Sequence, residues 1–194
     1  MALIELKTKI VELGKFLYEK GYIVATDGNI SVRLNRNEML ITSSGVCKGT
    51  MSPKDIVKMN LVSPHDQPED KRIKPSTEHQ MHQLIYAQRE DVNAIVHAHP
   101  VFSTVWTFTK KRLNSKLLTE TAETLGTIKL IGYFKPGSLQ LAQAVARLAV
   151  KYNVILLKRH GVVVLGSDLA EAKYRLERLE FLAKISFLHA HLTS

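Results

Sequence analysis

Residues 154–165 read VILLKRHGVVVL, two apolar runs that are separated by Lys158, Arg159, His160 and Gly161. Each run is short, apolar and rich in β-branched side chains, which is typical of a strand buried within a sheet. The residues between the runs predict a tight strand-to-strand turn. His160 then lies at the edge of the sheet, where its side chain can face a cleft.

Further regular elements surround this predicted hairpin. The spacing of apolar residues predicts strands at 30–34, 39–42, 57–62, 94–97 and 129–131, and helices at 3–19, 76–89, 100–108, 138–152 and from Asp168 toward the end of the chain. The segment 63–75, with three prolines and many charges, is predicted to be a surface loop. The alternation of helices and strands predicts a layered α/β protein, and a length of 194 residues fits one domain, 1–194.

The composition is that of a globular protein with a basic surface. The 27 Lys and Arg residues exceed the 18 Asp and Glu residues, which gives a net charge of +9 with histidine neutral. The positive residues are spread along the chain, and no aromatic–basic motif of a nucleic-acid-binding module accompanies them. We therefore expect no nucleic-acid partner.

The sequence also predicts a soluble, cytoplasmic protein that does not enter a membrane. Glu5, Lys7 and Lys9 interrupt the N-terminal segment, so no apolar core of a signal peptide is present. The longest uncharged run, 92–109, contains two histidines and a proline, which a membrane span would not tolerate. Cys47 is the one cysteine and has no internal disulfide partner, which fits a reducing cytoplasm.

Three histidines and one glutamate are candidate metal ligands. His97 and His99 are spaced i, i+2 at the end of a predicted strand, so both imidazoles project from the same face. Together with His160 and with Glu78, at the start of a predicted helix, they form a plausible site for a divalent ion. The alternative is that the histidines are hydrogen-bonded core residues and that Glu78 only begins its helix.

Small polar residues and glycines form a second candidate set, suited to an anion such as a phosphate. Glycine lets the backbone approach a phosphate closely, and a helix N-terminus favours negative charge. The candidates lie in three predicted loops: Gly28-Asn29, Ser43-Ser44-Gly45 and Ser76-Thr77. Taken singly, each of these loops is equally consistent with an ordinary turn or helix cap.

Five stretches, in this order along the chain, resemble successive signatures of the class II aldolase/adducin family: GNISVR (28–33), LITSSG (40–45), KPSTE (74–78), VHAHP (96–100) and LLKRHG (156–161). Within that family the chain is most similar to the L-fuculose-1-phosphate aldolase-like sugar-phosphate aldolases. The resemblance implies a three-layer α/β/α fold with a mixed, largely antiparallel central sheet. It further implies a homotetramer.

The resemblance also implies a chemistry and the residues that perform it. The expected reaction is cleavage of a phosphorylated ketose or pentulose to dihydroxyacetone phosphate and an aldehyde, through an enediolate that a zinc ion stabilises. Glu78 is expected to leave the metal and to shuttle the proton as the catalytic carboxylate. The zinc ion, one per subunit, is expected to be held by Glu78, His97, His99 and His160. The substrate phosphate is expected to contact Gly28, Asn29, Ser44, Gly45, Ser76 and Thr77.

Two features leave other reactions of the same scaffold open. The family's tyrosine acid would fall near Leu118, and no tyrosine occurs between Pro100 and Tyr133. Glu120 and Glu123 fall where related methylthioribulose-1-phosphate dehydratases carry a catalytic glutamate. Dehydration of that substrate and 4-epimerisation of a pentulose phosphate therefore remain alternatives. A non-catalytic, adducin-like role is a further alternative, against which the four candidate metal ligands argue.

Overall fold

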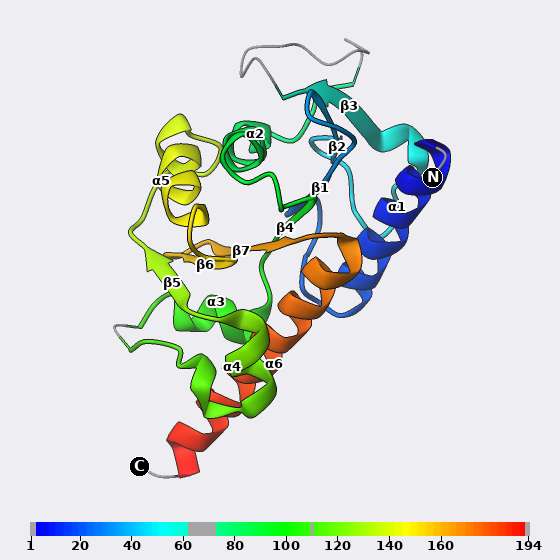
Figure 1. The fold of residues 1–194 in the computed structure, drawn as a ribbon. Coiled ribbons are helices and arrows are strands. Elements are labelled where there is room, and N and C mark those ends of the chain that lie inside the picture. The colour runs from blue at the N-terminus through cyan, green and yellow to red at the C-terminus, as the bar shows by residue number, and fades with distance from the viewer. Residues whose placement is uncertain (1–2, 62–72, 110, 193–194) are drawn as a thin grey trace.

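The computed structural model describes residues 3–61, 73–109 and 111–192, and its centre is a seven-stranded sheet (Figure 1). The strand order is β3-β2-β1-β4-β7-β6-β5. Neighbouring strands are antiparallel except for the pair of β5 and β6, which is parallel. The strands are β1 (Asn29–Arg33), β2 (Glu38–Thr42), β3 (Ile56–Asn60), β4 (Ala94–Ala98), β5 (Ile128–Ile131), β6 (Val154–Leu157) and β7 (Gly161–Gly166).

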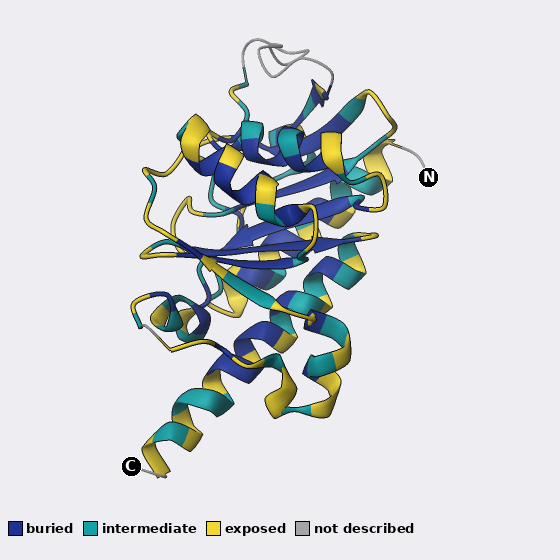
Figure 2. Ribbon diagram, turned by 60° about the vertical axis from the view of Figure 1, so that its left-hand side comes forward, coloured by how far each residue is buried: buried dark blue, intermediate teal, exposed yellow. Residues whose placement is uncertain are grey.

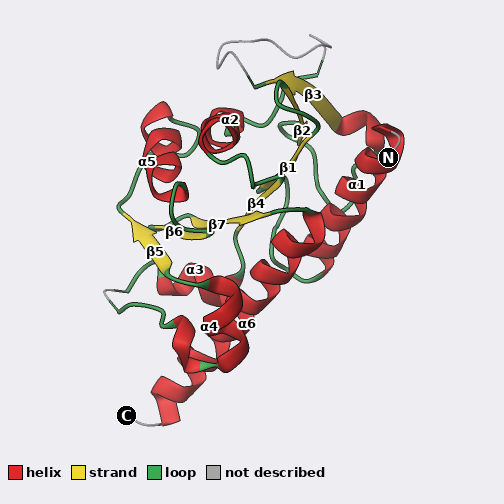
Figure 3. Cartoon of the chain, viewed as in Figure 1, coloured by secondary structure: helices red, strands yellow, loops and turns green. Residues whose placement is uncertain are grey.

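Helices cover both faces of the sheet and complete three layers (Figure 3). On one face lie α2 (His79–Gln88) and α5 (Leu139–Ala149). On the other lie α1 (Leu3–Glu19), α3 (Val101–Trp106), α4 (Thr119–Leu125) and α6 (Leu169–Leu192). Two 3₁₀ turns, Pro53–Asp55 and Ser115–Leu117, lie in the connections. The predicted three-layer fold with a mixed, largely antiparallel sheet is confirmed.

The hairpin of β6 and β7 is buried on both of its faces (Figure 2). Successive strand side chains point to opposite sides, so the apolar run divides between two cores. The core under α1 and α6 takes Val154, Leu156, Val162 and Val164. The core under α2 and α5 takes Ile155, Leu157, Val163 and Leu165. A continuous apolar run at this position is therefore the signature of a central strand pair.

The predicted elements are found with small shifts at their ends. The helix expected at 76–89 begins at His79. Just before it, Pro75 forms an isolated bridge with Ser43 and the amide of Ser76 donates to the carbonyl oxygen of Thr42. The helix α4 was not among the predicted elements. The predicted loop 63–75 lies mostly outside the described residues. Among the described residues, none of the helices is long and apolar enough to span a membrane.

The features that matter for the site gather at one end of the sheet. There β2 and β4 end, while β1 and β7 begin, because the pairings are antiparallel. The register pairs Asn29 with His97, and Ala98 with Val162. The chain segments that carry the candidate ligands are thus brought side by side from distant parts of the sequence.

Candidate functional site

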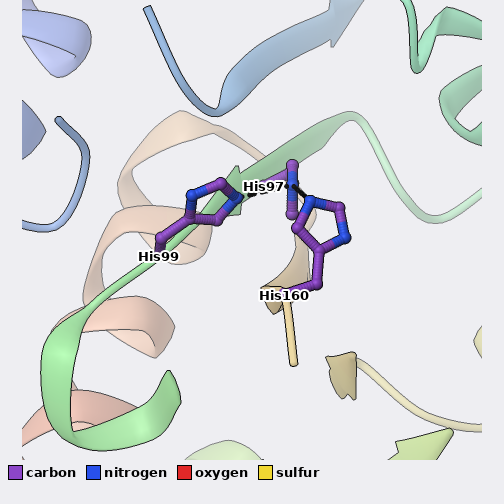
Figure 4. A group of neighbouring side chains, drawn as sticks. All are labelled: His97, His99 and His160. Carbon is purple, nitrogen blue, oxygen red and sulfur yellow. Dashed lines mark hydrogen bonds between the residues drawn. The ribbon is translucent and has the colours of Figure 1, made fainter. Parts of the chain in front are cut away.

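The side chains of His97, His99 and His160 converge at this end of the sheet (Figure 4). His97 lies on β4, His99 follows β4 directly, and His160 lies in the turn between β6 and β7. Nε2 of His97 is 3.1 Å from Nε2 of His99 and 3.2 Å from Nε2 of His160. The candidate ligand atoms of all three lie within 4.8 Å of one another. The structure therefore brings together three residues that the sequence placed in two separate motifs.

The contacts of the rings leave nitrogens free toward the common point. Nδ1 of His97 donates to the carbonyl oxygen of Val162 at 2.9 Å, so Nε2 is the nitrogen that faces the other two rings. Burial, together with the neighbouring His97 and His160, lowers the pKa of His99 to about 3. Burial and His97 lower the pKa of His160 to about 4. Neutral imidazole, the form that these pKa values favour at neutral pH, is the form that binds a metal ion.

Glu78 adds a buried carboxylate to the three rings. Its Oε2 accepts from Nδ2 of Asn29 at 2.8 Å and lies 3.1 Å from Nε2 of His97. Its Oε1 lies 3.8 Å from Nε2 of His160 and has no hydrogen-bond partner among the described residues. Burial raises the pKa of Glu78. The opposing effects of His97, His160 and the Asn29 hydrogen bond are together larger, so the pKa falls to about 2. The carboxylate is therefore ionised.

The donor set fits a divalent cation. A buried anionic oxygen without a partner is costly, and a cation beside it removes that cost. Three imidazole nitrogens and a carboxylate oxygen are ligand types that zinc prefers. The hydrogen bond from His97 to Val162 is also the kind of outer contact that fixes a metal-binding imidazole in orientation.

A cavity of about 300 Å³ opens beside this cluster. Two of the loops that form it are joined: Ser43 pairs with Pro75, and the amide of Ser44 donates to the carbonyl oxygen of Lys74. All the residues predicted to contact a phosphate line the cavity: Gly28, Asn29, Ser44, Gly45, Ser76 and Thr77. The predicted metal ligands and the predicted phosphate residues thus share one space.

Asn29 has a contact that the sequence did not predict. Besides donating to Glu78, its side chain faces His82, whose Nε2 is 2.6 Å from Oδ1 of Asn29. His82 is fully buried on α2, one helical turn beyond Glu78. From the sequence, His82 could be an outer contact of the site, one helical turn beyond Glu78, or a packing residue, and packing was the favoured interpretation. Only the pairing of β1 with its neighbours shows that this one lies behind the site.

Lys48 also lines the cavity and was not singled out from the sequence. Its side chain is buried, and Nζ donates to the carbonyl oxygens of Thr26 and Val46, which ties two loops of the cavity together. Burial lowers its pKa. Its position three residues after Gly45, in a loop predicted to bind an anion, could have identified it as a cavity residue. By contrast, Glu120 and Glu123 are exposed on α4.

A methyl group at Gly161 tests how closely His99 is held. A Cβ there would lie 2.4 Å from the carbonyl oxygen of Ala98 and 2.4 Å from Cδ2 of His99. We expect Gly161→Ala to cost about 1–3 kcal/mol of unfolding free energy, as overpacking does, and to weaken binding of a divalent metal ion such as zinc because the His99 ring must move. Thermal unfolding and zinc titration measure both effects. Gly132→Ala is the control, because among the described residues no heavy atom beyond its two chain neighbours lies within 4 Å of its Cβ position. Equal behaviour of the two variants would contradict the prediction.

The chain resembles known proteins over nearly its whole length. Residues 8–187 match the family described as Class II Aldolase and Adducin N-terminal domain. An L-fuculose phosphate aldolase of Methanococcus maripaludis is 34% identical over 190 residues, which cover 95% of this chain and 97% of that protein. A 3-oxo-tetronate 4-phosphate decarboxylase of Haemophilus influenzae is 32% identical over 189 residues, which cover 93% of this chain and 86% of that protein.

A solved structure shows the same likeness. The L-fuculose-1-phosphate aldolase from Thermus thermophilus superimposes with a TM-score of 0.85 at 28% identity, over 97% of this chain and 95% of that one.

Proposed function

Because the chain belongs to the class II aldolase and adducin family, we propose that it is a zinc-dependent aldolase of a phosphorylated ketose. The substrate is a ketose 1-phosphate of the L-fuculose 1-phosphate type, and the products are dihydroxyacetone phosphate and an aldehyde. Relatives with that name cover nearly the whole chain, and they support this choice over the dehydratase and epimerase alternatives.

One observation carries the proposal: Oε1 of Glu78, which has no hydrogen-bond partner within the described part of the chain, and three imidazoles face one another at a cavity lined by hydroxyl-bearing loops. A non-catalytic scaffold has no need of an ionised, buried carboxylate beside three imidazoles, because each buried polar group lowers stability unless it is satisfied. Perturbed groups gathered in a cleft are typical of an active site.

In this proposal the metal ligands, the hydroxyl groups of the loops and Glu78 have separate roles. His97, His99, His160 and Glu78 hold the ion, which supplies Lewis-acid stabilisation of the negative charge that develops on the substrate oxygens. Ser44, Ser76 and Thr77 offer hydroxyl groups to the phosphate and orient the ketose. Glu78 accepts the proton of the hydroxyl group next to the bond that breaks. The electron pair of that bond stays on the three-carbon fragment, and Glu78 delivers the proton to its carbon.

Decarboxylation of a 3-oxo acid phosphate is the second candidate. It is favoured by the relatives named 3-oxo-tetronate 4-phosphate decarboxylase and by the missing tyrosine between Pro100 and Tyr133. Loss of carbon dioxide releases no aldehyde, so it requires no acid such as the tyrosine beside the oxygen of an aldehyde product. The same cavity and the same Lewis acid serve both reactions.

A measurement on purified protein separates these functions. We expect about one zinc per chain, with release of dihydroxyacetone phosphate from one member of a ketose 1-phosphate panel; a chelator abolishes the release and zinc restores it. Inorganic phosphate is expected to compete with the substrate. Carbon dioxide release from 3-oxo-tetronate 4-phosphate in place of aldol cleavage would establish the second candidate. Protein that binds no divalent metal would overturn both.

The assembly, location and domain organisation stay predictions. We propose a homotetramer in the cytoplasm, built from one domain per chain. Sedimentation analysis of the full chain tests the assembly.

A further inference from the structure

A chain of buried polar side chains runs away from the cavity behind Glu78. Oδ1 of Asn29 is 2.6 Å from Nε2 of His82, and Nδ1 of His82 is 2.6 Å from Oγ of Ser31. Oγ of Ser31 is in turn 2.8 Å from the hydroxyl of Tyr86. All four side chains are buried, and they come from only two elements, β1 and α2.

Every hydrogen bond in this chain has a fixed direction. An ionised carboxylate can only accept, so Asn29 must donate through Nδ2, and its Oδ1 must accept from His82. Nε2 of His82 therefore carries the proton. Full burial lowers the pKa of His82 to about 3, so the ring is neutral and Nδ1 is an acceptor. Ser31 then donates to Nδ1, and Tyr86 donates to Ser31.

We propose that His82 is a positioning residue for the active site, which acts through Asn29 on Glu78. Its Nε2–H group holds the Asn29 amide with the NH₂ group turned toward Oε2 of Glu78. Oε2 thereby accepts the hydrogen bond from Asn29, and Oε1 is the oxygen that remains available to a ligand in the cavity. The inference rests on the proposed function in one respect, that Glu78 is the working carboxylate.

Reversal of the Asn29 amide shows why His82 is needed. If the amide turned over, its oxygen would face the carboxylate oxygen at 2.8 Å and its NH₂ group would face a second donor at 2.6 Å. Both contacts are repulsive in a buried site, where low polarity strengthens electrostatic interactions. Without the donor on His82, one of the two constraints is lost and the Glu78 carboxylate can turn.

Two amide substitutions at the same position separate positioning from packing. In His82→Gln the side-chain amide can reach the place of Nε2 and donate to Asn29. In His82→Asn the shorter amide reaches the place of Nδ1, so the contact with Ser31 stays and the contact with Asn29 is lost. Both variants replace one buried polar group by another, and we expect both to lower the unfolding temperature.

The readout is the dissociation constant of Co²⁺ alone, measured on the metal-free full chain by competition with a chelator. We expect His82→Asn to weaken Co²⁺ binding by about 10- to 100-fold, the range for outer contacts of metal ligands, and His82→Gln to stay within about threefold of the unmodified protein. In a Glu78→Gln background, His82→Asn should have no further effect, because the carboxylate it positions is gone.

Other outcomes would overturn the inference. Equal Co²⁺ affinities of His82→Gln and His82→Asn, or an effect of His82→Asn that persists in the Glu78→Gln background, would make His82 a packing residue. Nitrogen NMR of the metal-free, unmodified protein reports the His82 tautomer directly, and a proton on Nδ1 would also contradict it. None of these readouts uses a substrate, so they test the link from His82 through Asn29 to Glu78 separately from the reaction. A failed aldolase assay with the expected Co²⁺ affinities would overturn the proposed function and not this link.

Discussion

His97→Ala is expected to abolish metal binding and activity together. His97 is the central ring of the cluster, because its Nε2 lies within 3.2 Å of the other two imidazoles and 3.1 Å from Oε2 of Glu78. A bound divalent ion supplies several kcal/mol of transition-state stabilisation, so its loss is expected to lower kcat/KM by about a thousandfold or more. Metal analysis of the dialysed protein and the aldol-cleavage assay measure the two effects.

A second substitution at the same position separates the metal from the fold. Alanine also leaves the carbonyl oxygen of Val162 without its donor, which costs about 1–3 kcal/mol for a buried group. In His97→Asn the amide can still donate to Val162, so we expect a smaller fall in unfolding temperature and the same loss of metal. His191→Ala, at the exposed end of α6, is the control and should change neither. Retention of zinc by His97→Asn would remove His97 from the ligand set.

The fold could be predicted from the sequence wherever burial leaves a periodic pattern. The apolar runs 154–157 and 162–165 predicted the central hairpin, because strands that are covered on both faces are apolar at successive positions. In α4 the pattern is missing, since Thr121 and Leu125 are its only buried residues and a helix of seven residues offers little periodicity. The helix α4 packs against α6, which is distant in the sequence, and against the neighbouring 3₁₀ turn, which has no clear pattern of its own. Its helical state depends on these contacts.

The candidate site, like the fold, could be predicted in part from the sequence. Residue type and spacing identified the candidate metal ligands, because histidines at i, i+2 on a strand must share a face. The outer contacts could be predicted only in part. His82 was a possible outer contact with packing as the favoured role, and its bonds to Asn29 and Ser31 join residues 53 and 51 positions apart. Asn29 was predicted as a phosphate contact, which stays a prediction; the structure shows its side chain held between Glu78 and His82.

Glu78→Gln is expected to keep the protein folded and partly loaded with metal while turnover is lost. Glutamine matches glutamate in size and can still accept from Nδ2 of Asn29 through its carbonyl oxygen, so the buried position stays filled. It carries no charge and cannot shuttle a proton. A positioned acid–base group contributes about 10²- to 10⁴-fold, so we expect kcat to fall by that factor while KM for the phosphorylated substrate changes little.

The contrast with other carboxylates makes this prediction specific to Glu78. Glu78→Asp keeps the charge but draws the carboxylate back by one methylene group; we expect it to hold metal and to lose less activity than Glu78→Gln, because a carboxylate remains to move the proton. Glu120→Gln and Glu123→Gln, which alter exposed side chains on α4, should leave kcat unchanged. If Glu78→Gln turned over at the full rate while either α4 variant did not, Glu78 would not be the proton carrier and a carboxylate of α4 would take its place.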